Sequence, residues 1–399
     1  MERSTQHLAC SFCGTATAPG RAVVTASPRG VAICTTCLDA SGSLLATTPS
    51  DHVPSPVWVK ERLDRRVIGQ ERAKRQLAVA VHTHFRRKLV TDDDVEIGKS
   101  NVLLVGPTGT GKTHLVRTLA RLLDAPLHTA DATALTEAGY VGEDVQSMIG
   151  GLIQAAGGDV RRAAQGILYI DEIDKLASKG GSPAAGRDVG GEGVQQALLR
   201  LVEGCEVDVN LPRARGRTRR VSFDTSQVLV ICGGAFEGLD ALVARRVGAR
   251  GVGFGAGAAS RSTRRSEAPG IRAEDLHAFG LIPELVGRLP VLAHLSPLSE
   301  EDLVRVLTEP KDALFRQYQR LLRMDGVSLR ATRGALAAVA RRCIEVGAGA
   351  RSLRAVLEEV LLDVMFEAPS REDVEEIWIT EDVVMAGATP LLGLRSETG

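Results

Sequence analysis

Runs of apolar residues alternate with amphipathic stretches through the middle of the chain. Short apolar runs predict buried strands at residues 101–105, 126–129, 166–170 and 228–231. Stretches with the spacing of an amphipathic helix lie before and between these runs, at residues 71–89, 112–123 and 193–202. Because strands that alternate with helices form parallel sheets covered on both faces, the sequence predicts a three-layer α/β domain.

The pattern becomes mostly helical after Pro297. Ser299 is a good N-cap, and acidic residues in the following turn interact favourably with the helix dipole. Helices are expected at residues 335–346 and 352–366, and a strand at 376–380. The segments 40–56 and 248–270 have the composition of a linker and a loop.

These boundaries predict five parts. They are an N-terminal module (1–45), a linker (46–60), a large α/β domain (61–296), a small helical domain (297–386) and a flexible tail (387–399).

Composition narrows the class of protein. The chain has 399 residues, of which 44% are hydrophobic and 25% charged, and it can therefore bury a full core in two or three domains. No secretory leader is recognisable, and no apolar run approaches the roughly 18–20 residues of a membrane-spanning helix. The odd number of cysteines, seven, favours a reducing compartment over a disulfide framework. We therefore expect a soluble cytoplasmic protein.

Four of the seven cysteines lie near the N-terminus with the spacing of a zinc ribbon. They are Cys10, Cys13, Cys34 and Cys37, two C-x2-C pairs. Four thiolates complete a tetrahedral shell, so the predicted zinc is structural and supplies folding energy to a module too small for a core. The alternative is four unrelated thiols. The remaining cysteines, in apolar surroundings, are expected in the core.

A glycine-rich stretch lies between a predicted strand and a predicted helix and fits the phosphate-binding pattern G-x4-G-K-[ST]. Glycines let successive N–H groups face a phosphate, and the helix N-terminus adds partial positive charge. Lys112 is expected to contact the β- and γ-phosphates, and Thr113 to ligate Mg²⁺. The predicted nucleotide-binding residues are Gly106, Pro107, Thr108, Gly109, Thr110, Gly111, Lys112 and Thr113.

A second apolar run ends in two carboxylates, Asp171 and Glu172. Asp171 is expected to hold Mg²⁺ through its water shell, and Glu172 to act as the general base on the attacking water. Adjacent acids alone could be a solvated strand end. Together with the phosphate-binding loop they indicate NTP hydrolysis of the AAA+ type.

The sequence closely resembles the ClpX family of ATP-dependent protein unfoldases from residue 10 to about residue 370. The stretches that carry the resemblance are Leu63-Asp-Arg-Arg-Val-Ile-Gly-Gln70, Glu137-Ala-Gly-Tyr-Val-Gly-Glu-Asp144, Tyr169-Ile-Asp-Glu-Ile-Asp-Lys175, Gly191-Glu-Gly-Val-Gln-Gln-Ala-Leu-Leu199, Ile231-Cys-Gly-Gly-Ala-Phe236, Phe279-Gly-Leu-Ile-Pro-Glu-Leu-Val-Gly-Arg-Leu-Pro290 and Gly349-Ala-Arg-Ser-Leu-Arg354.

The resemblance implies an AAA+ large and small domain, a homohexamer, and ATP with Mg²⁺. It also implies that Val67 and Ile68 hold the adenine. Arg288 matches the arginine finger that reaches a neighbouring subunit's γ-phosphate, and Arg351 matches the sensor-2 arginine. A guanidinium at a transferring phosphoryl group stabilises developing charge. Without the motifs, either arginine would be interpreted as a surface ion pair.

The resemblance further implies that Tyr140 and Val141 line an axial pore that grips substrate, with Arg187 on a second pore loop. An aromatic side chain between glycines can pack against many peptide sequences. Val252, Gly253 and Phe254 match the loop that docks a ClpP-type peptidase, with valine in place of the family's isoleucine. A basic stretch at residues 212–220 differs from the family's Arg-Lys-His pore-entrance loop and leaves the tag preference open.

We therefore predict an ATP-driven ring unfoldase that feeds tagged proteins to a ClpP-type peptidase and receives substrates or adaptors through its zinc module. Alternatives are a peptidase-independent remodeller, an HslU-like unfoldase and a zinc-ribbon AAA+ factor acting on nucleic acid. The HslU-like alternative is disfavoured because that family lacks the four-cysteine module. The nucleic-acid alternative is disfavoured because 49 basic and 49 acidic side chains cancel and no aromatics interleave with basic runs.

Overall fold

The computed structural model describes residues 10–14, 23–25, 32–34, 37, 53–90, 95, 97–135, 145–177, 191–212, 218–249 and 270–394. The chain divides into two compact units, Met1–Pro54 and Ser55–Gly399. In the first unit, β1 (Val23–Thr25) and β2 (Ala32–Cys34) form an antiparallel pair in which Val23 lies opposite Cys34. Among the described helices, none is long and apolar enough to cross a membrane.

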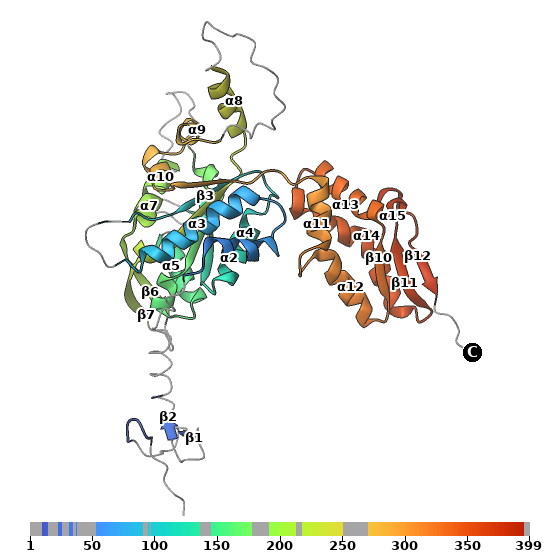
Figure 1. Cartoon of the computed structure of the whole chain (residues 1–399), viewed down its shortest axis with the longest axis horizontal. Coiled ribbons are helices and arrows are strands. Elements are labelled where there is room, and N and C mark those ends of the chain that lie inside the picture. The colour runs from blue at the N-terminus through green and yellow to red at the C-terminus, as the bar shows by residue number, and fades with distance from the viewer. Residues whose placement is uncertain are drawn as a thin grey trace, which may run out of the picture. The chain divides into compact units, whose positions relative to one another are not determined.

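The second unit contains a five-stranded parallel sheet with the order β4-β5-β8-β3-β9. The label β3 marks this sheet in Figure 1, with α3 and α4 labelled beside it. The strands of the sheet are β3 (Val102–Val105), β4 (Leu127–Asp131), β5 (Ile167–Asp171), β8 (Leu229–Gly234) and β9 (Val291–His294). The four predicted strands are confirmed, each beginning one residue later than expected. The fifth strand, β9, was not predicted, because its four residues follow a proline and end in a histidine.

Helices cover both faces of this sheet. Val102 and Leu104 of β3 pack into one apolar cluster with α2 (Pro56–Asp64), α3 (Glu71–Arg87) and α4 (Lys112–Leu122). Leu103 and Val105 point to the other face and pack with α5 (Val145–Ala155), α7 (Gly191–Glu203) and α10 (Pro283–Gly287). Both faces of β3 are therefore buried, which explains its continuous apolar sequence. The predicted three-layer α/β domain is confirmed.

Further elements surround this core. The helices are α6 (Val160–Ala164), α8 (Leu239–Ala249) and α9 (Ala273–Phe279). Short 3-10 helices are η1 (Ala132–Ala134), η2 (Ile173–Leu176) and η4 (Thr225–Gln227). An antiparallel hairpin of β6 (Glu206–Pro212) and β7 (Thr218–Asp224), which the sequence did not predict, packs against α5.

The C-terminal part of the second unit is mostly helical, as predicted. Its helices are α11 (Glu300–Thr308), α12 (Leu314–Met324), α13 (Arg333–Glu345), α14 (Leu353–Glu367) and α15 (Glu381–Ala386), with η5 (Gly349–Arg351) and η6 (Ala368–Ser370). The predicted cap is confirmed, because the Asp302 N–H donates to Ser299 Oγ at 3.1 Å and the Ser299 N–H donates to Asp302 Oδ2 at 3.3 Å.

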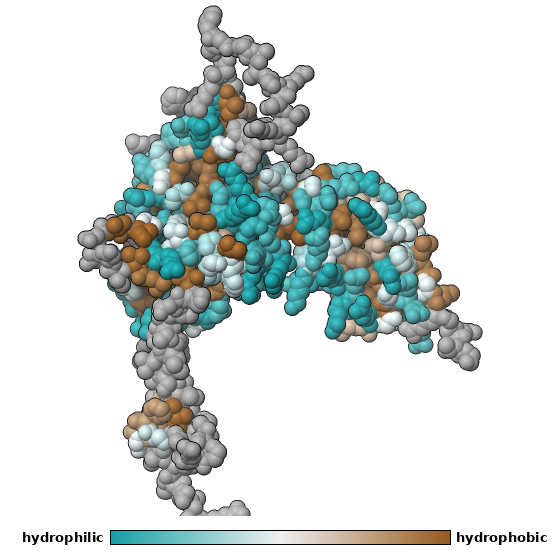
Figure 2. All heavy atoms as spheres, viewed as in Figure 1, coloured by the Kyte–Doolittle hydropathy of each residue, from teal (hydrophilic) through white to brown (hydrophobic). Residues whose placement is uncertain are grey.

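A small sheet covers one side of these helices. In it, β11 (Val374–Ile379) pairs in parallel with β10 (Ser328–Ala331) and antiparallel with β12 (Leu391–Leu394). Hydrophobic side chains gather near the β11–β12 end (Figure 2), where Leu391 and Leu394 are exposed.

Two predicted boundaries were wrong. The tail predicted to be flexible from residue 387 contains β12, because its leucines pair with β11. The predicted linker ends too late, because α2 begins at Pro56 with Ser55 as its N-cap. Proline is favoured in the first turn of a helix, so the proline that suggested a linker instead begins the helix.

Candidate nucleotide and metal sites

The glycine-rich loop connects β3 to α4 in tight contact with other backbone segments. A Cβ on Gly106 would lie 2.3 Å from the Leu295 carbonyl oxygen, and one on Gly109 would lie 2.1 Å from the Ala348 carbonyl oxygen. Gly109 also has φ +82°, a conformation that residues with a Cβ rarely adopt. The loop therefore needs glycine at both positions, and Gly111 at the N-cap leaves the N-terminus of α4 facing the loop.

Lys112 folds back into this loop. Its Nζ donates to the carbonyl oxygens of Gly106 at 2.5 Å and Pro107 at 3.1 Å. The side chain is buried, and burial lowers the pKa of Lys112 despite the opposing effect of Asp171. The ammonium is thus held in a partly desolvated position, where its interaction with an anion is stronger than in water.

Thr113 and Asp171 meet at the carboxyl end of β5, next to the loop. The Thr113 hydroxyl donates to Asp171 Oδ2 at 2.9 Å, and the Glu172 N–H donates to Asp171 Oδ1 at 3.0 Å. These oxygen donors fit a hard cation such as Mg²⁺. Glu172, the residue after β5, has φ 58° and is exposed to solvent.

One cavity of about 620 Å³ joins these groups. Most of the predicted ATP-site residues line it: Val67, Ile68, Thr108, Gly109, Thr110, Gly111, Lys112, Thr113, Asp171, Glu172 and Arg351. Gly106 and Pro107 lie behind the lining and accept from Lys112. The C-terminal helical part contributes the other wall, where the Ala350 N–H donates to the Gly109 carbonyl at 3.1 Å.

The two predicted arginines lie in different places. Arg351, in η5, lines the cavity, and its charge is one of the influences that lower the pKa of Lys112, after burial. Arg288 follows α10 and does not line this cavity. Its Nε donates to Glu203 Oε1 at 2.8 Å, and its side chain is 60% exposed.

Sequence reasoning missed several residues that shape the site. The Gln70 side chain donates to the Ser296 carbonyl at 2.8 Å and accepts from the Ser296 N–H at 3.0 Å. These two hydrogen bonds join the residue before α3 to the segment that follows β9. Buried Asp174 accepts the N–H groups of Ala235 and Phe236, both at 3.2 Å. Both residues belong to the quoted motifs, but their partners are far away in sequence, so only the folded chain identifies their contacts.

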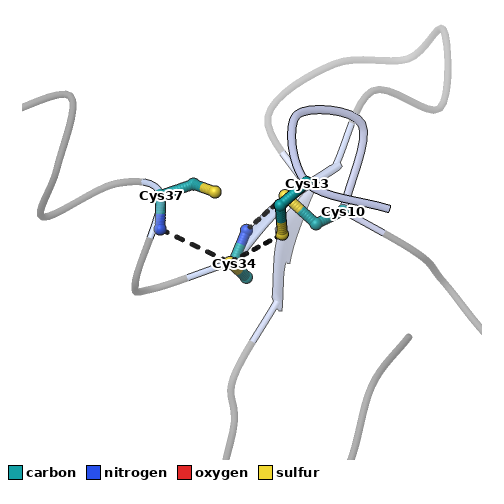
Figure 3. A group of neighbouring side chains, drawn as sticks. All are labelled: Cys10, Cys13, Cys34 and Cys37. Carbon is teal, nitrogen blue, oxygen red and sulfur yellow. Dashed lines mark hydrogen bonds between the residues drawn. The ribbon is translucent and has the colours of Figure 1, made fainter. Parts of the chain in front are cut away.

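The four N-terminal cysteines come together as predicted (Figure 3). Their sulfur atoms all lie within 4.8 Å of one another, and Cys13 Sγ is 3.8 Å from Cys34 Sγ. A tetrahedral zinc with Zn–S bonds of about 2.3 Å requires sulfurs about 3.8 Å apart, so the donor set fits zinc. Backbone N–H groups of Cys13 and Cys34 lower the pKa of Cys10 to about 6, which favours its thiolate.

The other cysteines behave as core residues. Cys232 and Cys343 are buried, and Cys205 is partly buried against the large core. Burial raises the pKa of the Cys232 thiol to about 12.

Several predicted sites lie outside the described residues. They are Tyr140, Val141 and Arg187 of the expected pore loops, Val252, Gly253 and Phe254 of the expected docking loop, and residues 213–217 of the basic stretch.

Comparisons with known proteins agree with this geometry. Residues 98–292 match the AAA domain family (Cdc48 subfamily), and residues 298–380 match the C-terminal, D2-small domain of ClpB protein. The chain is 45% identical over 392 residues to a protein of Treponema denticola described as the ATP-dependent Clp protease ATP-binding subunit ClpX. The match covers 94% of each chain.

Proposed function

The chain belongs to the ClpX family of AAA+ ATPases, and from this we propose that it unfolds tagged proteins and passes them to a ClpP-type peptidase. The observation that carries the proposal is the cavity in which the phosphate-binding loop, Asp171, Glu172 and Arg351 converge. As an ATPase subunit, the chain has a source of free energy that can drive unfolding.

The base of ATP would lie against Val67 and Ile68, two buried residues that line the cavity. The Val67 N–H donates to the Leu63 carbonyl at 2.8 Å, and its carbonyl accepts from Lys74. In the described part of the chain, no hydrogen bond involves the backbone of Ile68. Its N–H and carbonyl are therefore available to the donor and acceptor edge of adenine.

Hydrolysis requires a water to attack the γ-phosphorus while the bond to the bridging oxygen of ADP breaks. Glu172 would accept the proton of that water, and Lys112 would hold the β- and γ-phosphates. Thr113 and Asp171 would hold Mg²⁺, which when bound neutralises charge on the phosphate oxygens. Arg351 would add positive charge from the other wall of the cavity.

The position of Arg288 supports assembly into a ring. A finger that does not line the cavity of its own subunit can serve a neighbouring one, as the homohexamer proposal requires.

Within such a ring, Tyr140, Val141 and Arg187 would contact the translocating chain, and Val252, Gly253 and Phe254 would contact the peptidase. The zinc module would receive substrates or adaptors. Arg219 at the start of β7 is exposed, and repeated around a ring it would attract acidic tags, whereas the charge of Arg220 is compensated by Asp208. Four clustered thiols suit the reducing cytoplasm, which is the location we propose.

The proposal is tested with a stable fluorescent protein that carries candidate C-terminal tags, mixed with ATP, this protein and a ClpP-type peptidase. We expect ATP-dependent loss of fluorescence and fragments of the reporter. Glu172→Gln should retain ATP binding and lower hydrolysis by roughly 10²–10⁴-fold. Wild-type turnover in that variant would refute the assigned site, and unfolding without fragments would refute only the peptidase partnership.

A further inference from the structure

The side chain of Arg288, the proposed arginine finger, is bound by the carboxylate of Glu203 within its own subunit. Its Nε donates to Glu203 Oε1 at 2.8 Å. In the described part of the chain, neither terminal amino group, Nη1 nor Nη2, donates a hydrogen bond. The Nε–H of the guanidinium is therefore bound, while both terminal amino groups are available for a bidentate contact with two phosphate oxygens.

The backbones of this pair are fixed by one buried side chain. Asn101, 1% exposed, donates from Nδ2 to the carbonyls of Val202 at 3.0 Å and Arg288 at 3.2 Å. Its Oδ1 accepts from the Val230 N–H at 3.4 Å. Asn101 thus ties the last turn of α7, which ends at Glu203, to the turn that carries Arg288.

The pair itself contributes little to folding. The side chains of Arg288 and Glu203 are 60% and 39% exposed, and ion pairs this exposed to solvent stabilise proteins weakly. Buried Leu289 and the hydrogen bond from the Arg288 N–H to the Leu285 carbonyl hold the turn without it. What the carboxylate adds is a restriction on a long and otherwise freely rotating side chain.

We propose that Glu203 is a positioning residue: it binds the Nε edge of Arg288 and presents the two terminal amino groups to the triphosphate bound by the neighbouring subunit. This inference rests on the proposed function, in which Arg288 acts between subunits. A finger already oriented loses less conformational freedom when it reaches the transition state, so Glu203 should affect kcat more than KM.

A double-mutant cycle on assembled rings tests this role. Glu203→Ala should lower kcat for ATP hydrolysis by roughly 10- to 100-fold, the cost of a misplaced catalytic group, and change KM by less than about twofold. Glu203→Gln keeps an acceptor oxygen for Nε and should restore most of the rate. Glu284→Ala is the matched control, because Glu284 is an exposed carboxylate on α10 without a partner in the described chain.

The deciding comparison uses Arg288→Ala. In that background Glu203→Ala should cause no further loss, because there is no finger to orient. An equal loss in both backgrounds, or an unchanged kcat in Glu203→Ala with normal melting and ring assembly, overturns the inference. If Arg288→Ala alone hydrolyses ATP at the normal rate, the finger assignment in the proposed function fails instead.

Discussion

Lys74 is the buried member of a cluster of four charges that supports the segment carrying Val67 and Ile68, and its replacement gives the sharpest test of the packing. Lys74, on α3, has only 2% of its side chain exposed. Its Nζ lies 2.5 Å from Asp64 Oδ1 and 2.8 Å from Glu71 Oε1, and it donates to the Val67 carbonyl at 3.2 Å. Lys60 contacts the other oxygens of both carboxylates, at 2.6 and 2.7 Å.

Replacing Lys74 with Met removes one charge of this cluster and keeps most of the side-chain volume. Lys74 is the buried partner, and Asp64 and Glu71 keep their contacts with Lys60 and with solvent, so losing its hydrogen bonds should cost about 1.5–3 kcal/mol. One kcal/mol shifts the melting temperature of a domain of 150–250 residues by about 2–4 °C, so Lys74→Met should lower it by roughly 3–12 °C. The Val67 carbonyl also loses its partner, so the affinity for ATP should fall.

The pH dependence gives an independent check. Hydrogen bonds from Lys60 and Lys74 lower the pKa of Glu71, and they lower the pKa of Asp64 although burial alone would raise it. Carboxylates with lowered pKa stabilise the fold above their unfolded pKa of about 4 and lose this contribution as the pH falls through the folded value. The difference between wild type and Lys74→Met should therefore be constant from pH 7 to pH 5 and shrink below about pH 4.

Calorimetry or melting curves at a fixed nucleotide concentration measure the effect. Lys311→Met is the control, because Lys311 is exposed and a surface substitution should change stability by less than about 0.5 kcal/mol. A shift for Lys74→Met no larger than that of the control would refute the reasoning. A shift that grows on acidification would also contradict it.

Three further predictions follow from single contacts. Gly106→Ala should abolish nucleotide binding or destabilise the large domain, because the new Cβ would lie 2.3 Å from the Leu295 carbonyl oxygen. The control Gly98→Ala, whose Cβ would have no atom within 4 Å, should bind a fluorescent ATP analogue normally. Cys13→Ser should lower the zinc content measured by mass spectrometry and unfold the N-terminal module, while ATP hydrolysis by the remaining unit persists. Cys232, buried and with a pKa raised to about 12, should resist alkylation at pH 8 until urea unfolds the chain, and rapid native labelling would contradict its burial.

The inner strands of the central sheet could be predicted from sequence because they are buried on both faces. β3 and β8 are buried throughout and β5 is buried up to Asp171, whereas β4 lies at the sheet edge with two exposed residues. β9 and β12 escaped prediction because each lies at a sheet edge and is mostly not buried, unlike β3, which has the same length but is buried throughout. Sequence patterns report local burial, but pairing at a sheet edge depends on segments that are distant in the chain.

In the nucleotide site too, features within one short segment could be predicted, and contacts between distant segments could not. The phosphate-binding loop and the Asp171–Glu172 pair each lie within a few consecutive residues, so spacing alone indicates their chemistry. Gln70, Asp174 and Glu203 have partners 226, 61 and 85 residues away, respectively. Their roles depend on contacts that form only when the sheet and both groups of helices are assembled.

Strand β3 connects the site of one subunit with the finger proposed to serve the next. Gly106, which begins the phosphate-binding loop, follows its last residue, and Asn101, which holds the Arg288 carbonyl, precedes its first residue. Four residues of a parallel strand span about 13 Å. β3 is hydrogen-bonded to β8 on one side and β9 on the other, so it is held as a rigid element. β3 therefore fixes the separation between the phosphate-binding loop and Asn101, and through the Asn101 hydrogen bond it also sets the position of the Arg288 backbone.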